Sequence, residues 1–205
     1  MQQTSQNWVT EITDFILKLG FAQKEPPAPS GLLALLVTDL AGFTPLVERL
    51  GDRRSQHVIQ HHNRALRACV DAHHGMEVTH MGDGLLTAFR SVANALRCAR
   101  AMQLELAEQR SNDPQAPLHA RMGLHAGEPL PEEDRLFGHC VNVSVRVCAQ
   151  ARADSVLVSH LVKELAQGQF EFKSGRNYLL KGVAAPACLY EFEWGEARAE
   201  PRLTG

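Results

Sequence analysis

The stretch from Leu32 to Thr38 is a continuous apolar run that Asp39 closes. A run of this kind, without alternation of polar and apolar residues, is typical of a strand buried on both faces. The sequence therefore predicts that the main domain, residues 32–195, begins with a buried strand. The segment Ala41-Gly42-Phe43-Thr44 is expected to turn the chain directly after it.

A tight hairpin is the second strong signal. Two short strand-like runs, Met76–His80 and Leu85–Phe89, flank an Asp-Gly pair at 83–84. Helical periodicity on either side of the hairpin gives the order β-α-β-β-α-β, the ferredoxin-like pattern of an α+β domain, with extra strands at the C-terminus. The other expected elements are a helix over 52–74 ended by Gly75, a helix from its cap Ser91 to about 109, a strand over 118–126, an acidic loop over 128–135, a helix over 137–151, a strand over 156–159, a helix over 161–166 and a β-meander over 170–194.

The segments outside the main domain are short. Apolar residues recur at helical spacing in residues 1–24, which predicts an amphipathic N-terminal helix. Prolines make residues 25–31 a stiff linker. Residues 196–205 are expected to form a tail.

Composition and charge exclude several classes of protein. The net charge of −2 leaves no broad basic field, so a nucleic acid polymer is not an expected partner. The five cysteines are odd in number and form no C-x-x-C pair, which argues against a disulfide framework or a zinc ribbon. With no signal peptide and no apolar stretch of membrane-spanning length, a cytoplasmic protein without membrane association is expected.

Two aspartates, Asp39 and Asp83, stand at sharp turns next to apolar runs. In a ferredoxin-like sheet the first strand and the hairpin can be neighbours, which would bring the two carboxylates together. They would repel each other unless a cation lay between them. Oxygen ligands suit Mg²⁺ or Mn²⁺. Taken singly, each aspartate is also compatible with an ordinary turn residue.

Five motifs in order, over about residues 32–194, resemble those of class III adenylate and guanylate cyclase catalytic domains. Any one of them is weakly specific, whereas the ordered set is highly specific. The motifs are Val37-Thr38-Asp39-Leu40-Ala41-Gly42-Phe43-Thr44, then Gly75-Met76-Glu77-Val78 with Met81-Gly82-Asp83-Gly84, Arg121-Met122-Gly123-Leu124-His125-Ala126-Gly127-Glu128, Phe137-Gly138 with Val141-Asn142 and Arg146, and Leu180-Lys181-Gly182.

The resemblance implies a role for each matching residue. Asp39, the main chain of Leu40, and Asp83 would hold two divalent cations, Mn²⁺ or Mg²⁺. Arg121 would contact the triphosphate from the same subunit. The amides that would cradle the phosphates belong to Leu40, Ala41, Gly42, Phe43 and Thr44.

The family's site lies between two antiparallel catalytic domains, and this chain carries both halves of the motif set in one domain. The resemblance therefore implies a homodimer with two equivalent composite sites. From the facing subunit, Asn142 would orient the ribose, Arg146 would stabilise charge on the α-phosphoryl group, and Lys181 would bind the terminal phosphates. Asn142 and Arg146 are four residues apart and would share a helix face.

Two positions that select the base in this family differ here. ATP users carry Lys where this chain has Thr79, and Asp or Thr where it has Arg135. Arg135 offers only donors, whereas the adenine amino group needs an acceptor. This favours a pyrimidine nucleotide, UTP before CTP, as in the compact cyclases of the Pycsar antiphage systems, which resemble this layout. GTP also remains open, and ATP remains the alternative if Asp134 supplies the acceptor.

Two other readings stay open. A cyclase-like domain could bind nucleotide without turnover, although this chain keeps all of the matching polar residues. A ferredoxin-like module such as a diguanylate cyclase relative or a palm-type polymerase would share the sheet and the aspartates but would not need Asn142, Arg146 or Lys181. His57, His61 and His62 are expected to lie on a solvated helix face rather than to bind zinc.

Overall fold

The computed structural model of the chain describes residues 31–132, 135–166 and 168–195. The predicted helix over 1–24 and the tail over 196–205 lie outside these residues, as does the linker apart from Gly31. The described elements are β1 (Leu33–Leu40), α2 (Phe43–Leu50), α3 (Asp52–Ala72), β2 (Met76–His80), β3 (Leu85–Phe89), α4 (Val92–Asn112), β4 (Ala120–Gly127), β5 (Leu130–Glu132), β6 (Arg135–Phe137), α5 (His139–Gln150), β7 (Val156–Ser159), α6 (His160–Leu165), β8 (Arg176–Tyr178) and β9 (Ala187–Glu191).

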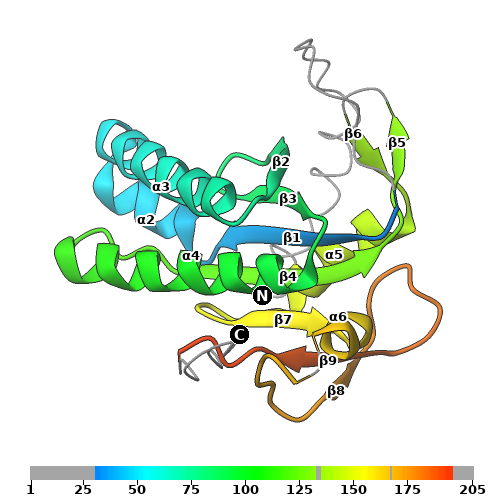
Figure 1. The fold of residues 1–205 in the computed structure, drawn as a ribbon. Helices are drawn as coiled ribbons and strands as arrows, with labels where there is room; N and C mark the ends of the chain where they lie inside the picture. Colours follow the sequence, from blue (N-terminus) through cyan, green and yellow to red (C-terminus); the bar gives the residue numbers. More distant parts are fainter. Residues whose placement is uncertain (1–30, 133–134, 167, 196–205) are drawn as a thin grey trace, which may run out of the picture.

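The main sheet has seven strands in the order β2-β3-β1-β4-β7-β9-β8 (Figure 1). Its first four strands, with the helices between them, form the predicted ferredoxin-like βαββαβ unit. Strands β1 and β4 of this unit pair antiparallel along their whole length. The added strands β7, β9 and β8 extend the sheet beyond β4, with β7 parallel to β4. The α+β prediction is confirmed.

The apolar run in β1 is explained by two separate cores. Its even-numbered residues, such as Leu36, face the core formed with α3 and α4, whereas its odd-numbered residues, such as Leu35, face the core formed with α5. Figure 1 shows α3 and α4 together on one face of the sheet and α5 on the other. Because side chains of a strand alternate between faces, a strand covered on both faces needs apolar residues at every position.

Three local features differ from the expectation. The segment after the predicted turn continues into the helix α2, and the acidic loop contains the short antiparallel pair β5–β6. Helix α3 ends with a left-handed residue at His74, φ 56°, not at Gly75. The amides of His74 and Gly75 bond back to the carbonyls of Asp71 and Val70, which is the Schellman arrangement. Gly75 is required for a different reason, because a Cβ there would lie 2.4 Å from the Phe89 ring.

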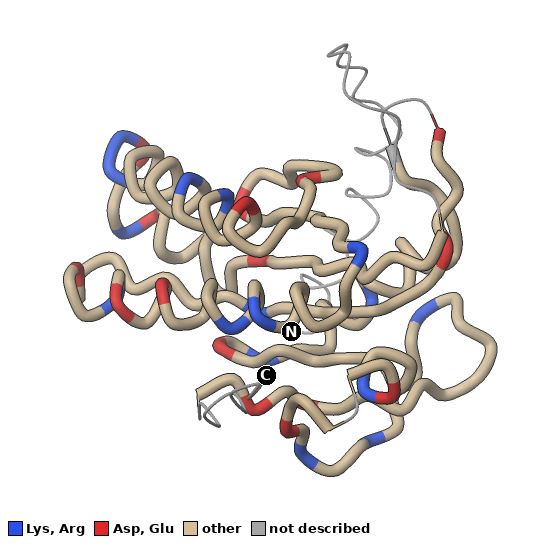
Figure 2. The backbone as a smooth tube through the Cα atoms, in the orientation of Figure 1, with Lys and Arg blue, Asp and Glu red and all other residues tan. Residues whose placement is uncertain are grey.

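Charge is mixed over the surface. In Figure 2, Lys and Arg lie interspersed with Asp and Glu along the described chain, in agreement with the small net charge. None of the described helices combines the length and the apolar character needed to cross a bilayer.

Candidate active site

The end of β1 places Asp39 directly opposite Arg121 of β4. The Arg121 Nε atom donates to Asp39 Oδ2 at 2.6 Å, and the side chains of both residues are largely buried. A charge-assisted hydrogen bond of this length fixes the carboxylate at the end of the strand. The predicted metal residue and the predicted triphosphate residue are therefore joined by the register of the sheet.

The β2–β3 hairpin brings Asp83 to the same edge. The Met81 amide donates to the Gly84 carbonyl at 2.8 Å and closes the turn. The Leu85 amide donates to the Thr38 hydroxyl at 3.0 Å, which fastens the hairpin to β1. A Cβ on Gly84 would lie 2.1 Å from the Thr38 carbonyl oxygen, so the hairpin approaches β1 as closely as a backbone without a side chain allows.

The two aspartates interact electrostatically. The pKa of Asp83 is raised to about 6, mainly by burial and next by the Asp39 carboxylate, while a main-chain hydrogen bond and Arg121 act in the opposite direction. Two adjacent carboxylates, one of them costly to ionise, fit a divalent cation. No group of three or more His, Cys, Asp or Glu residues suited to a metal occurs in the described part of the chain. The remaining ligands would be main-chain oxygens, water and substrate phosphates, as is usual for Mg²⁺.

The predicted phosphate loop has fewer open amides than the sequence indicated. The Ala41 amide donates to the His119 carbonyl at 2.7 Å, so it is not open to a phosphate oxygen. Gly42 adopts a left-handed φ of 71° and precedes α2, whose first residues are Phe43 and Thr44. First-turn amides have no carbonyl within the helix to bond to. The amides of Gly42, Phe43 and Thr44 are thus open donors of the loop.

The other predicted polar residues lie on a different surface. Asn142 is exposed and Arg146 is half-buried, on the side of α5 opposite its seven buried residues. The buried side of α5 packs on the sheet, so Asn142 and Arg146 point away from it. Lys181 is exposed in a turn that contains Gly182 at φ 80°. Its neighbour Leu180 is buried in the same core as Val143 and Val147 of α5, which places this turn beside the helix.

The two predicted base-selecting positions lie on strands that touch. Thr79 is half-buried in β2, next to an irregularity of the β2–β3 pairing between Glu77 and Thr79. Arg135 is the first residue of β6, which contacts β2. The structure therefore brings the two chain segments together.

A polar network behind the hairpin was not predicted from the sequence. The Asn63 amide group lies within 3.4 Å of the Gly82 carbonyl and 3.5 Å of His80 Nε2. Arg67 donates to the Glu77 carboxylate at 2.6 and 3.0 Å and lies 3.4 Å from His80 Nδ1. Glu77 and Gly82 belong to the second motif, whereas Asn63, Arg67 and His80 lie outside the motifs and had no signal in the sequence.

The prediction for one histidine of α3 was wrong. His62 is 1% exposed, although its neighbours His57 and His61 are exposed as expected. It lies on the same face as Leu66, four residues later, which belongs to the core between the sheet and the helices α3 and α4. The helical spacing, and not the polarity of the side chain, therefore determines that His62 is buried.

Comparison with known proteins gives the family. The family described as the Adenylate and Guanylate cyclase catalytic domain matches residues 26–192. A Rhizobium meliloti (strain 1021) protein, whose name places it among the adenylate cyclases, is 29% identical over 175 residues, which are 83% of this chain and 30% of that protein. The chain thus spans less than a third of the length of that relative.

Solved structures agree with this assignment. The guanylyl cyclase Cya2 superposes with a TM-score of 0.71 at 25% identity, over 82% of this chain and 94% of that one. The adenylyl cyclase CyaB from P. aeruginosa has the same fold, with a TM-score of 0.70 at 19% identity over 82% and 96% of the two chains. The chain belongs to the adenylate and guanylate cyclase catalytic domain family, the class III nucleotidyl cyclases.

Proposed function

We propose that the chain converts a nucleoside triphosphate into its 3′,5′-cyclic monophosphate and pyrophosphate. The observation that carries this proposal is the joint placement of Asp39, Asp83 and Arg121 at the edge formed by β1, the hairpin and β4. In the reaction the ribose 3′-oxygen bonds to the α-phosphorus, the bond from that phosphorus to the bridging β-phosphate oxygen breaks, and the hydroxyl proton leaves to solvent. No covalent enzyme intermediate is needed, because positioning and electrostatic stabilisation can supply the rate.

The residues of this edge would bind the triphosphate. Asp39, Asp83 and the main-chain carbonyl of Leu40 would hold two divalent cations, Mn²⁺ or Mg²⁺, whose chemistry is to acidify the 3′-hydroxyl and to neutralise phosphate charge. The open amides at the start of α2 would donate to phosphate oxygens. Arg121 would share its donors between Asp39 and the triphosphate.

A second copy of the chain would complete the site. The outward direction of Asn142 and Arg146 on α5, and the position of Lys181 beside the same helix, support this part of the proposal. Exposed apolar side chains accompany them, since Phe137 is 53% and Leu179 is 82% exposed. Each site would take its carboxylates from one copy and its Asn142, Arg146 and Lys181 from the other, so a monomer would be inactive.

For the base we propose a pyrimidine, UTP before CTP. Thr79 is neutral, and Arg135 supplies only donors, which match the keto oxygens of uracil or cytosine better than the amino group of adenine. A cyclic pyrimidine product would fit a role in antiviral signalling of the Pycsar type. The name of the Rhizobium meliloti relative favours ATP, and we retain cyclic AMP synthesis as the second candidate.

The test is product identification. The purified chain is incubated with Mn²⁺ and with ATP, GTP, CTP or UTP separately, and the products are identified by mass, with Asn142→Ala as the inactive control. Cyclic UMP or cyclic CMP is expected, and the pair Thr79→Lys with Arg135→Asp should shift the preference towards ATP. Cyclic AMP from the unmodified chain would retain the reaction and overturn the choice of base. No product from a folded dimer would overturn the cyclase activity itself.

A further inference from the structure

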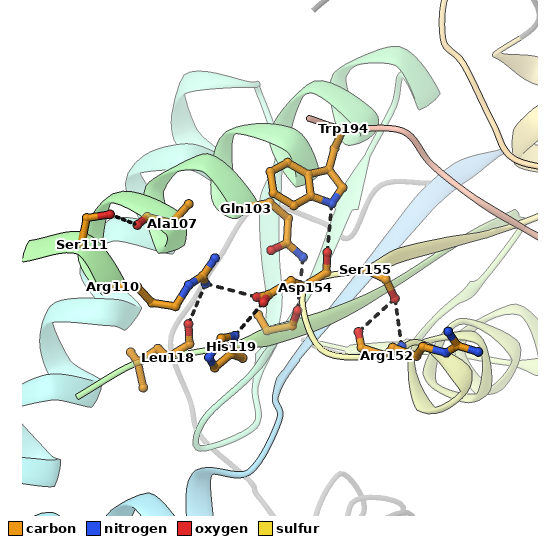
Figure 3. Close-up of polar contacts among 11 residues, drawn as sticks. Gln103, Ala107, Arg110, Ser111, Leu118, His119, Arg152, Asp154, Ser155 and Trp194 are labelled. Carbon is orange, nitrogen blue, oxygen red and sulfur yellow. Dashed lines mark hydrogen bonds and ion pairs between the residues drawn. The ribbon is translucent and has the colours of Figure 1, made fainter. Parts of the chain in front are cut away.

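The turn before β7 is held in an unusual conformation. Asp154 has a left-handed φ of 59°, which only a few residue types other than glycine tolerate. Its carboxylate accepts from two residues, since Oδ1 lies 3.1 Å from Arg110 Nη1 and Oδ2 lies 2.6 Å from His119 Nδ1. Figure 3 shows the carboxylate of Asp154 between these two side chains. Backbone strain that is retained in this way marks a position that the surrounding contacts hold firmly.

The same turn grips the first residues of β4 through its main chain. The Asp154 amide donates to the Ala120 carbonyl at 2.8 Å, and the Met122 amide donates to the Ser155 carbonyl at 3.0 Å. These two hydrogen bonds bracket Arg121, the residue that holds Asp39. The position of the Asp154 turn therefore fixes the strand position from which Arg121 reaches the candidate site.

His119 connects the turn to the phosphate loop. Its imidazole contacts the Asp154 carboxylate, and its carbonyl accepts from the Ala41 amide at 2.7 Å. Ala41 directly precedes Gly42, whose left-handed conformation starts α2 and directs the open amides. A chain of short contacts thus runs from the Asp154 carboxylate through His119 to the loop that follows Asp39.

Two further elements are anchored at this turn. Arg110, in the last turn of α4, donates both to Asp154 and, at 2.8 Å, to the Leu118 carbonyl. The Trp194 indole donates to the Asp154 carbonyl at 3.0 Å, which ties the segment after β9 to the same residue (Figure 3). Asp154 is therefore the point at which α4, β4 and the C-terminal segment meet.

We propose that Asp154 is a positioning residue for the active site. Its carboxylate and its turn hold His119 and Arg121 in place, and through them the Ala41 amide and the Asp39 carboxylate. Asp154 touches neither substrate nor cation, and acts on the binding of both by keeping the metal and phosphate groups preorganised. This inference rests on the proposed nucleotidyl cyclase function and adds a residue that no cyclase motif contains.

The experiment uses the full chain with Asp154→Gly, Asp154→Asn and a matched control. Glycine keeps the left-handed turn accessible and removes the carboxylate, so the contacts are lost without added backbone strain. Asparagine keeps one acceptor oxygen and tolerates the same φ. The control, Asp113→Asn, removes an ion pair between Arg54 and Asp113 that joins α3 to the end of α4, and it leaves an acceptor oxygen for the Gln115 amide in the segment before β4.

Asp154→Gly is expected to raise the half-saturating concentrations of Mn²⁺ and of the triphosphate about tenfold, with a much smaller change in kcat. Asp154→Asn should recover part of this loss, and Asp113→Asn should show none of it. If a folded Asp154→Gly protein has the same half-saturating concentrations of Mn²⁺ and of the triphosphate as the unmodified chain, the inference is overturned. If this variant does not fold, His119→Phe removes the imidazole link while leaving the His119 carbonyl, and the same shift is expected.

A second readout separates this inference from the proposed function. Binding of Mn²⁺ with a non-cyclisable nucleoside triphosphate analogue is measured by the thermal shift that it produces. If the unmodified chain binds but makes no cyclic product, the proposed activity fails, and weaker binding by Asp154→Gly than by Asp113→Asn still supports the positioning role. Equal binding by these two variants overturns that role whether or not turnover occurs.

Discussion

The His62 imidazole lies inside the helical layer, and neither of its ring nitrogens has a hydrogen-bond partner among the described residues. Its pKa is lowered to about 4, mainly by burial and to a smaller extent by the nearby His61 and His80. The unfolded chain takes up a proton near pH 6.5, whereas the folded chain takes it up only near pH 4. The stability contributed by a neutral His62 is thus present above pH 6.5 and is lost as pH falls towards 4.

His62→Leu should make the fold less sensitive to acid. The substitution removes two buried, unpartnered polar atoms, so the free energy of unfolding should also rise at neutral pH. The pKa difference corresponds to about 3 kcal/mol at most that the unmodified chain loses between pH 6.5 and 4. Urea unfolding at a series of pH values measures the slope of the free energy of unfolding against pH. His57→Ala, at an exposed position of the same helix, should leave the slope unchanged, and an unaltered slope in His62→Leu would contradict the assignment.

Asn63 acts on the hairpin turn next to Asp83. Its side-chain amide contacts the Gly82 carbonyl and His80, and its removal frees the turn on the side of α3. Asn63→Leu should raise the Mn²⁺ concentration for half-maximal activity roughly tenfold. Arg64→Ala is the matched control, because Arg64 lies on the exposed side of α3 and, among the described residues, its side chain bonds to the Gln60 carbonyl of its own helix. Equal metal dependence in the two variants would count against this role.

At the scale of single elements, the hairpin depends on two glycines for different reasons. Gly82 has a left-handed φ of 78° with open space around it, whereas Gly84 has no room for a side chain beside the Thr38 carbonyl. Gly82→Ala should cost about 1–2 kcal/mol of unfolding free energy from conformation alone. Gly84→Ala must push the hairpin away from β1, so it should cost more and also weaken Mn²⁺ binding. Thermal unfolding of both variants with and without Mn²⁺ tests these predictions. A smaller loss of stability in Gly84→Ala than in Gly82→Ala would contradict them.

Elements with strong local signals were predictable. The predicted bounds of both hairpin strands agree with the observed ones, because the Asp-Gly turn between them determines where they begin and end. Ser91 caps α4 as expected, since its hydroxyl accepts from the Asn94 amide. Helix α2 was missed because its eight residues follow a turn signal and include Pro45. The β5–β6 pair was missed because its strands have three residues each, too few for a period to show.

The site was predictable where sheet register alone assembles it. The opposition of Asp39 and Arg121 follows from the antiparallel pairing of two strands that the motifs already marked. The contributions of Asn63, His119 and Asp154 could not be predicted, because each depends on contacts between segments distant in the sequence. The engagement of the Ala41 amide by His119 likewise follows only from the three-dimensional arrangement.

At the scale of the whole molecule, the composite site makes a prediction about mixtures. Asp83→Ala and Arg146→Ala should each be inactive as homodimers, because every site then lacks one half. In a mixed dimer one site carries both substitutions and the other carries neither. Mixing equal amounts under exchange conditions should therefore restore about a quarter of the unmodified activity. Activity measured before and after mixing tests this, and a mixture that stays inactive despite exchange would contradict the shared site.

The outward face of α5 has a consequence for how such an enzyme responds to its own abundance. If Asn142 and Arg146 serve only the carboxylates of another copy, output follows the number of pairs and not the number of chains. While most chains are unpaired, a doubling of their concentration raises the rate about fourfold. A cell could then keep the signal low by scarcity alone and switch it on through modest accumulation or local crowding of the chain.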